Sequence, residues 1–178
     1  MHYAIIDHNG NNIERRQAMK IKFYAVGGTI DKVYFDKKST YEVGKPLLDE
    51  ILRASNITFD YEIELIIGKD SLDMTEEDRR SLREKISSDQ NRLIVLTHGT
   101  DTMIETAKYL KEIEGKTIVL TGSMEPARFR SSDAVFNVGC AIAAVQVLQA
   151  GVYIVMNGRI FDPEKVWKNI DLSRFEEL

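Results

Sequence analysis

The sequence predicts an α/β fold in which a mainly parallel five-stranded sheet lies between two layers of helices. Three observations support this. Short β-rich runs recur along the chain, segments with a helical pattern separate them, and glycine and hydroxyl residues cluster where the runs end. Alternation of strand and helix is typical of parallel sheets, whose ligand sites lie at the carboxyl ends of the strands. The polar clusters are therefore expected at one edge of the sheet.

Five runs are short and apolar enough to be buried strands of a parallel sheet. They read MKIKFYAVGG (19–28), YEIELIIG (61–68), NRLIVLTHG (91–99), GKTIVLTG (115–122) and GVYIVMNG (151–158). With 178 residues and 43% hydrophobic content, the chain suits one compact domain, which we place at 19–178. The predicted architecture is a three-layer sandwich of the flavodoxin-like or Rossmann-like kind.

Helix starts are read from capping residues. Segment 74–89 carries Thr75 followed by Asp78, which resembles a capping box, and segment 101–115 carries Thr102 followed by Glu105, a closer match to that pattern. In the last segment, 161–178, Asp162 is a predicted N-cap with Pro163 at the first helical position. We expect this last segment to start as a short helix.

Two stretches do not fit the alternation. Residues 1–18 hold one apolar run, YAII, which leads into the turn-rich DHNGNN, so they predict an extra hairpin arm or a loose leader. Residues 31–46 are polar, aromatic and too irregular for a helix, and they predict a long loop after the first strand. Loops of that length are often functional.

Composition excludes several partners. The net charge of -4 comes from 24 basic and 28 acidic residues spread along the chain, so no basic stripe predicts binding to nucleic acid or to an anionic membrane. The single Cys140 excludes an intrachain disulfide and is expected to pack as a small core residue, which fits a reducing cytoplasm. No membrane span or secretory signal is recognisable, so the protein is expected to be soluble and cytoplasmic.

Motifs for metals and nucleotides are also missing. His2, His8 and His98 are scattered and no other residues show metal-ligand spacing, so no metal is expected. The paired glycines of YAVGGTIDK lack the spacing of a dinucleotide fingerprint, and EIEGKTIV lacks the upstream glycine of a phosphate-binding loop. No cofactor is therefore expected.

Hydroxyl and carboxylate groups at the strand ends remain as candidates for chemistry: Thr29, Ser71, Thr100, Asp101, Thr121 and Ser123. The alternative interpretation is that such residues simply cap helices, which explains Thr75, Thr102 and Asp162 well. Capping explains Thr29 poorly, because Thr29 follows two glycines and leads into a loop. It also leaves the HGTD turn at 98–101 with more polar groups than one cap requires.

A threonine hydroxyl is a weak nucleophile at neutral pH. Acyl transfer from it needs a partner that accepts its proton and donors that stabilise the oxyanion. Lys168 and Tyr41 could supply the first of these. Taken alone, however, a lysine is more often a solvated surface residue and a tyrosine more often a packing aromatic.

Together these residues resemble a known family. The segments GGTI (27–30), YEVGK (41–45), DSLDM (70–74), HGTDTM (98–103), TGSM (121–124), SSDAVFN (131–137) and MNGRIFDPEKVWK (156–168) are similar, in order and approximate spacing, to the amino-terminal catalytic domain of bacterial-type L-asparaginases. The resemblance covers nearly all of the chain from Met19 onward. It implies hydrolysis of L-asparagine to L-aspartate and ammonia without metal or cofactor.

The resemblance also implies roles for individual residues. Thr29 would be the nucleophile, assisted by Tyr41, while Thr100, Asp101 and Lys168 would form a second catalytic group; from the residues alone, either threonine could be acylated. Ser71 and Asp101 would hold the α-carboxylate and α-amino groups of the substrate. The full set of implied substrate-binding residues is Gly28, Ser71, Leu72, Gly99, Thr100, Asp101 and Ser123.

Three departures from the family pattern change what is expected. Leu72 stands where secreted members usually carry glutamine, which predicts looser recognition of the amino acid. Val26 and Asp31 flank the glycines where the family usually has TGGTIA, and Asp31 adds a negative charge near an anionic product. Family members are usually nearly twice this length, so we expect a short form or a fragment.

The departures keep two alternatives open: a weakly catalytic amino-acid-binding module, or an amidase for glutamine or another small amide. Because a lone sheet leaves its active edge open to water, we expect a homodimer or higher homo-oligomer to close the site. Loop 31–46 is expected to form part of that closure.

Overall fold

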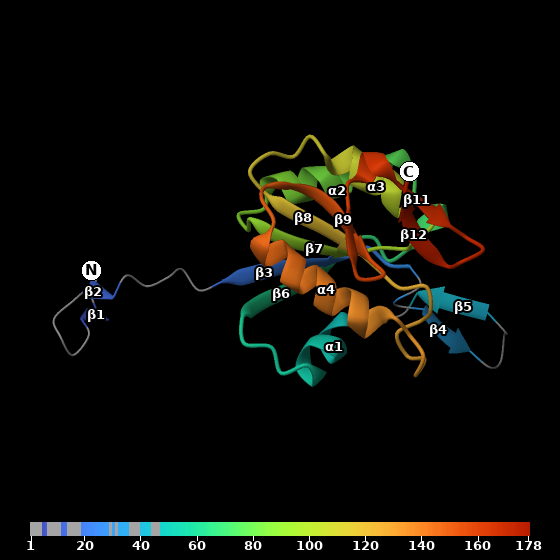
Figure 1. The fold of residues 1–178 in the computed structure, drawn as a ribbon, viewed down its shortest axis with the longest axis horizontal. Helices are drawn as coiled ribbons and strands as arrows, with labels where there is room; N and C mark the ends of the chain where they lie inside the picture. The colour runs from blue at the N-terminus through green and yellow to red at the C-terminus, as the bar shows by residue number, and fades with distance from the viewer. Residues whose placement is uncertain are drawn as a thin grey trace.

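A six-stranded sheet forms the centre of the molecule in the computed structural model, which describes residues 5–6, 12–13, 19–28, 30, 32–35, 40–43 and 47–178 (Figure 1). The strands are β3 (Lys20–Ala25), β6 (Asp60–Leu65), β7 (Leu93–Thr97), β8 (Thr117–Thr121), β9 (Gly151–Met156) and β10 (Arg159–Phe161). The first five lie in the five predicted runs and pair in parallel, whereas β10 pairs antiparallel with β9. The predicted α/β class with a mainly parallel sheet is confirmed, and β10 is an additional strand.

The order of the strands places a switch point beside β3. Across the sheet they run β10-β9-β8-β7-β3-β6, so the five parallel strands follow the flavodoxin-like order in which the first strand lies between the second and the third. The chain leaves β3 for β6 on one side and later returns to β7 on the other side. In such sheets a ligand crevice opens at the carboxyl ends of the strands at the switch point. Here that is the end of β3 and β7, next to residues 26–28 and 98–101.

Helices cover both faces of the sheet (Figure 1). On one face, α2 (Glu76–Ser88) and α3 (Met103–Leu110) pack over a core that includes Leu96 and Leu120. On the other face, α1 (Leu48–Ala54) and α4 (Ala134–Val147) pack over a core that includes Val95 and Val119. The central strands are buried on both faces, which explains why they read as continuous apolar runs rather than alternating ones. Cys140, on α4, is half-buried and packs against the second core.

The two predicted capping boxes have opposite outcomes. At the start of α2, the Thr75 side chain accepts from the Asp78 amide at 3.2 Å and Asp78 accepts from the Thr75 amide at 2.9 Å, so the first prediction is confirmed. At the start of α3, the prediction is wrong, because Thr102 makes no side-chain cap. Its hydroxyl instead donates to the carbonyl of Ser71 at 2.8 Å, and Glu105 pairs with Arg79 of α2.

The carboxyl-terminal segment forms a hairpin after its predicted cap. Asp162 accepts from the Glu164 amide at 3.0 Å and starts the short 3-10 helix η3 (Pro163–Lys165), as predicted. The chain then forms β11 (Val166–Asn169) and β12 (Arg174–Glu177), an antiparallel pair that was not predicted. A second hairpin joins β9 to β10 through Asn157 and Gly158, both with positive φ.

Smaller elements lie before α1 and after β6. The backbone of Ile5–Ile6 (β1) pairs with Asn12–Ile13 (β2), and Lys32–Phe35 (β4) pairs with Thr40–Val43 (β5), both antiparallel. Segment 31–46, predicted as an irregular loop, therefore holds a two-stranded ladder. A 3-10 turn, η2 (Ser71–Asp73), follows β6. Within the described part of the chain, no helix is long and apolar enough to cross a membrane.

Candidate active site

Three backbone segments meet without intervening side chains at the carboxyl ends of β3 and β7. A Cβ atom built on Gly28 would lie 2.4 Å from the Cα of Gly99, and one built on Gly99 would lie 2.3 Å from the Ser71 hydroxyl oxygen. Gly28 has φ +105° and Gly27 φ +108°, conformations that L side chains rarely adopt. The glycines at 27, 28 and 99 are thus explained by close approach and backbone conformation, and they bring the three predicted polar segments together.

The turn after β7 presents Thr100 and Asp101 to Lys168. The Lys168 ammonium donates to Thr100 Oγ1 at 2.8 Å and to Asp101 Oδ1 at 2.5 Å, although 68 and 67 residues separate them in sequence. Thr100 is 3% exposed, the Lys168 side chain 18% and the Asp101 side chain 44%. A hydroxyl held this close to an amine, beside a carboxylate that faces solvent, forms an array in which a proton can move between oxygen and nitrogen.

Ser71 reaches the same place from the end of β6. Its hydroxyl is buried and has no hydrogen-bond partner among the described residues. Thr102 holds its carbonyl, and Asp70 caps the turn by accepting from the Leu72 amide at 3.1 Å. An unpartnered buried hydroxyl costs stability, so it is a candidate to bind a polar group of a substrate. The Leu72 side chain is 71% exposed and projects into solvent.

His98 lies under the Thr100 turn and was not predicted as a site residue. It is fully buried, and its Nδ1 lies 2.8 Å from the Gly99 carbonyl oxygen. Because a carbonyl only accepts, Nδ1 carries the proton, and Nε2 has no partner among the described residues. The pKa of His98 is lowered to about 4, chiefly by burial and also by the charge of Arg79, while the hydrogen bond to Gly99 acts in the opposite direction. His98 is therefore neutral near pH 7.

The hydroxyls of Thr121, at the end of β8, and of Ser123, just after it, both donate to backbone carbonyls. Thr121 donates to the Val155 carbonyl at 2.9 Å, and Ser123 donates to the Glu125 carbonyl at 2.6 Å. Both side chains are buried. Thr121 thus bonds within the sheet, and Ser123 bonds within the loop that follows β8, while its predicted role in substrate binding stays a prediction.

The side chains of two predicted catalytic residues, Thr29 and Tyr41, are not described. Thr29 lies outside the described residues, as does Asp31, so the expectations for both stay predictions. The backbone of Tyr41 lies in β5 opposite Tyr34, and the role of its side chain also stays a prediction. The structure therefore brings together Gly28, Ser71, Gly99, Thr100, Asp101 and Lys168 out of the predicted set.

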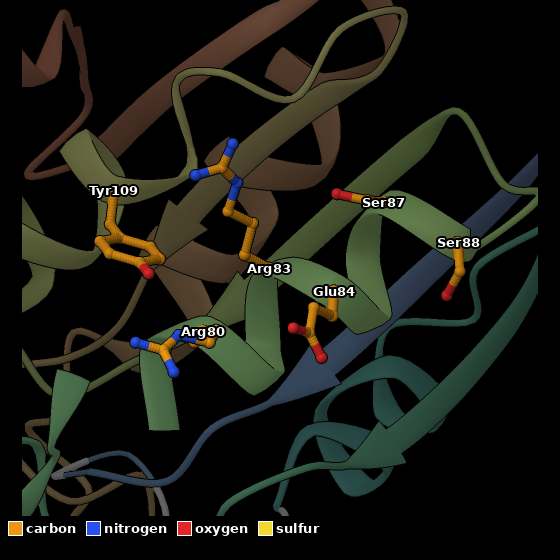
Figure 2. Close-up of a pocket in the computed structure, with 6 residues that line it drawn as sticks. All are labelled: Arg80, Arg83, Glu84, Ser87, Ser88 and Tyr109. Carbon is orange, nitrogen blue, oxygen red and sulfur yellow. The ribbon is translucent and has the colours of Figure 1, made fainter. Parts of the chain in front are cut away.

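Another hollow lies elsewhere on the surface and is lined mainly by exposed charged and polar side chains. It has a volume of about 660 Å³ and is shown in Figure 2, lined by Arg80, Arg83, Glu84, Ser87, Ser88 and Tyr109 of α2 and α3. Its arginines are already engaged: Arg80 pairs with Glu77, and Arg83 pairs with Glu112 and lies over the Tyr109 ring. Its arginines are exposed and paired and hold no arrangement suited to acyl transfer, so we place the site at the strand ends.

Comparison with known proteins identifies the family. The family profile described as "Asparaginase, N-terminal" matches residues 20–175. The chain belongs to the asparaginase family. It is 32% identical to L-asparaginase 2 of Escherichia coli over 174 residues, which cover 89% of the chain and 49% of that protein. It is also 32% identical to a glutaminase-asparaginase of Acinetobacter glutaminasificans, over 83% of the chain and 49% of that protein.

Solved asparaginase structures share the fold. The thermostable L-asparaginase of Thermococcus kodakarensis superposes with a TM-score of 0.77 at 27% identity, covering 90% of this chain and 51% of that one. A probable cytoplasmic L-asparaginase of Campylobacter jejuni superposes with a TM-score of 0.73 at 30% identity, covering 89% and 51%. The chain thus spans about half the length of these asparaginases, and residues 20–175, which match the family profile, include Thr100, Asp101 and Lys168.

Proposed function

We propose that the protein is an L-asparaginase-type amidohydrolase that converts L-asparagine to L-aspartate and ammonia. The observation that carries the proposal is the contact of Lys168 with Thr100 and Asp101, made between two distant segments at the switch point of the sheet. Membership in the asparaginase family supports the same reaction class. No group of three or more His, Cys, Asp or Glu suited to a metal ion occurs among the described residues, and the proposed chemistry uses side chains only.

In the proposed mechanism a threonine hydroxyl attacks the side-chain amide carbon of asparagine. The hydroxyl proton passes to a basic group, the C–N bond breaks as the nitrogen takes up a proton and leaves as ammonia, and an acyl-threonine remains. Water then attacks the ester, which releases aspartate and restores the hydroxyl. We assign the nucleophile to Thr29 with Tyr41 as its assistant, and the proton-transfer group to Thr100 and Lys168. Trapping of an acyl adduct on Thr100 instead of Thr29 would reverse that assignment.

The substrate's α-groups are proposed to bind at the exposed side of the array. The Asp101 carboxylate is 44% exposed and can pair with the α-ammonium group, and the buried Ser71 hydroxyl can donate to the α-carboxylate. Gly28 and Gly99 contribute by letting their backbone segments and Ser71 approach one another closely beside the array. Leu72 faces solvent beside Ser71 and offers no polar contact, so recognition of the α-groups is expected to be weak.

The test is ammonia release from L-asparagine and L-glutamine by the purified chain, with calorimetric binding of both amino acids measured in parallel. We expect faster release from asparagine, with no effect of EDTA. Lys168→Met serves as the inactive reference, since it keeps the aliphatic stem and removes the ammonium. Loss of activity with EDTA would contradict the metal-free chemistry.

Two other outcomes correspond to alternatives with specific support. Comparable turnover of glutamine would match the glutaminase-asparaginases among the relatives. Asparagine binding without ammonia release would indicate a binding module, an alternative that the apolar Leu72 favours.

We further propose that a cytoplasmic homodimer or larger homo-oligomer is the active form, because the Asp101 side of the array is open to water. Specific activity should then fall on dilution below the dissociation constant of the assembly. Light scattering and activity over a matched dilution series would check this. A monomer that is fully active at every concentration would contradict it.

A further inference from the structure

Lys168 is carried by an element that cannot hold its own position. The β11–β12 hairpin exposes Trp167, Ile170 and Leu172, and an isolated two-stranded hairpin is only marginally stable in water. Yet its lysine lies 2.8 Å from Thr100. The contact therefore requires that the body of the domain fix the hairpin.

Val166 and Phe175 of the hairpin pack in the core of the domain, and Glu177 pairs with Arg159 of β10. The register of the hairpin shows where a further contact, a hydrogen bond to the body of the domain, is made. Lys168 lies directly opposite Phe175, and Leu178 donates to the Lys165 carbonyl at 3.0 Å. Hydrogen-bonded and non-hydrogen-bonded pairs alternate along an antiparallel ladder, so the pair of Lys168 and Phe175 is a non-hydrogen-bonded one. The amide of Phe175 consequently points out of the hairpin. It donates to Asn157 Oδ1 at 2.9 Å.

Asn157 connects the hairpin to the interior of the domain. It occupies the turn between β9 and β10 with φ 54°, and its own amide donates to Asn137 Oδ1 at 3.1 Å. Asn137 is fully buried in α4, and its Nδ2 donates to the Gly122 carbonyl at 3.0 Å and to Asp133 Oδ2 at 2.8 Å. One buried amide thus joins the loops after β8 and β9.

The chain of contacts returns to the turn that carries Thr100. A Cβ atom on Gly122 would lie 2.3 Å from the His98 carbonyl oxygen, so the backbone after β8 presses against the end of β7. The hairpin that carries Lys168 and the turn that carries Thr100 are therefore joined through the same series of contacts. The connection runs from His98 through Gly122, Asn137 and Asn157 to Phe175.

We propose that Asn157 and Asn137 are positioning residues for Lys168, which hold its hairpin at the distance that the Thr100 array needs. The inference rests on the proposed role of Lys168 in amide hydrolysis. Asn137 uses both the donor and the acceptor of its amide, and Asn157 combines an acceptor with a positive φ that asparagine tolerates well. The site thus depends on two amides that touch neither substrate nor lysine.

Asn157→Gly tests the proposal most directly, because glycine adopts the positive φ freely and only the acceptor is lost. Asn157→Asp keeps the acceptor and is the conservative variant. Asn169→Ala is the matched control, since Asn169 lies on the same hairpin but bonds only within it, to Leu172 and Glu176. Asn137→Asp, which keeps the volume and loses the donor to Gly122, provides a second route.

The first measurement is independent of catalysis. Limited acetylation followed by peptide mass spectrometry gives the labelling of Lys168 relative to exposed Lys165. We expect this ratio to rise several-fold in Asn157→Gly and Asn137→Asp, and to stay at the wild-type value in Asn157→Asp and Asn169→Ala. Urea midpoints confirm that each variant is folded. An unchanged ratio in folded Asn157→Gly would overturn the proposal.

The second measurement is kinetic. Misplacing a catalytic group by about 1 Å costs roughly 100-fold in rate, so kcat for asparagine should fall about 10- to 100-fold in Asn157→Gly while KM changes little, with recovery in Asn157→Asp. Wild-type kcat in a variant with raised labelling would also overturn the proposal. If the unsubstituted protein releases no ammonia, the proposed function fails, and the labelling ratio still decides whether the asparagines position Lys168.

Discussion

Polar groups are bonded differently at the two ends of the parallel strands, which we call the amino edge and the carboxyl edge of the sheet. At the amino edge polar groups satisfy one another: the Tyr24 hydroxyl donates at 2.5 Å to Asp89, which precedes β7, and Lys116, just before β8, donates to the carbonyls of Asp89 and Asn91. Farther along β3, buried Lys22 donates to Glu62 and Glu64 of β6. At the carboxyl edge three buried atoms have no partner among the described residues: Ser71 Oγ, Thr97 Oγ1 and His98 Nε2. The carboxyl edge thus combines satisfied polar groups, such as Thr121 and Asn137, with buried ones that are available to bond a ligand.

The same contrast appears in the charges. Hydrogen bonds from Tyr24 and Asn91 outweigh the effect of burial and lower the pKa of Asp89, and burial together with the bond to Asp89 raises the pKa of Tyr24. Both shifts favour the forms that bond to each other at neutral pH. In contrast, His98 at the other edge stays neutral because its surroundings disfavour a proton.

The largest expected effect is on turnover and distinguishes two buried threonines, Thr100 at the carboxyl edge and Thr117 at the amino edge. Thr100→Ala should lower turnover of asparagine by roughly 1,000-fold, because it removes a group proposed to take part in proton transfer. Thr117→Ala removes the same atoms at the start of β8 and should leave turnover within about twofold. Steady-state kinetics with both variants checks this, and equal losses would contradict the division between the edges.

Acid should weaken the fold through the carboxyl edge first. The folded-state pKa of His98 is about 4, below its ordinary value of 6.5, so the unfolded chain binds more protons between these values. The stabilisation is present above pH 6.5 and is lost as the pH falls toward 4. The free energy of unfolding should drop by roughly 2 to 3 kcal/mol from pH 7 to pH 4.5.

Urea titrations across this range measure the drop, and His98→Asn provides the control. Asparagine can still donate to the Gly99 carbonyl but does not titrate, so its pH dependence between 4.5 and 6.5 should be flatter. An identical slope in both proteins would exclude His98 as the source. The contribution of Asp89 is lost only below its ordinary pKa of 3.8, outside this range.

At the amino edge, Tyr24→Phe should cost stability and spare function. It removes one hydrogen bond to the Asp89 carboxylate and leaves the ring packed, so we expect a loss of about 1.5 kcal/mol in the free energy of unfolding. Turnover measured at a temperature where the variant is folded should be unchanged. A selective loss of turnover would show that the edges are coupled.

The smallest expected effect has the opposite sign. Thr97→Val keeps the shape of the side chain and removes a buried hydroxyl without a partner among the described residues, so it should raise the free energy of unfolding by about 1 kcal/mol. Urea unfolding against the wild type measures the gain. A loss of stability would mean that the hydroxyl is satisfied in solution.

Sequence patterns located the strands because buried parallel strands are continuous apolar runs. They do not predict β10, although Asn157–Gly158 between two apolar runs is a strong hairpin signal, because a glycine that closes an apolar run fits the end of a strand as well as a hairpin turn. They also gave Thr102 a cap that it does not make. The capping pattern is local, whereas the bond from Thr102 to Ser71 spans 31 residues and depends on tertiary structure.

The sequence also predicted part of the candidate site, but not the contacts that position its residues. Glycine and hydroxyl clusters indicated the strand ends, and resemblance to asparaginases singled out Lys168, which the residues alone could not separate from a surface lysine. His98 was considered only as a metal ligand. The sequence could not show that Asn137 and Asn157 bond to each other, because such bonds depend on side-chain geometry. An asparagine within the apolar run of α4 was nevertheless a readable sign of a buried polar contact.

The long separation between Thr100 and Lys168 has a consequence for synthesis on the ribosome. Domains fold from the amino terminus as the chain emerges, and β3, β6, β7, β8 and β9 all precede the lysine hairpin. A nascent chain can therefore assemble its parallel sheet, with Thr100 and Asp101 in place, before residue 168 has left the exit tunnel. The contact of Lys168 with Thr100 and Asp101 then forms in a late step, so we expect chains that stop short of the hairpin to lack the proposed catalytic array.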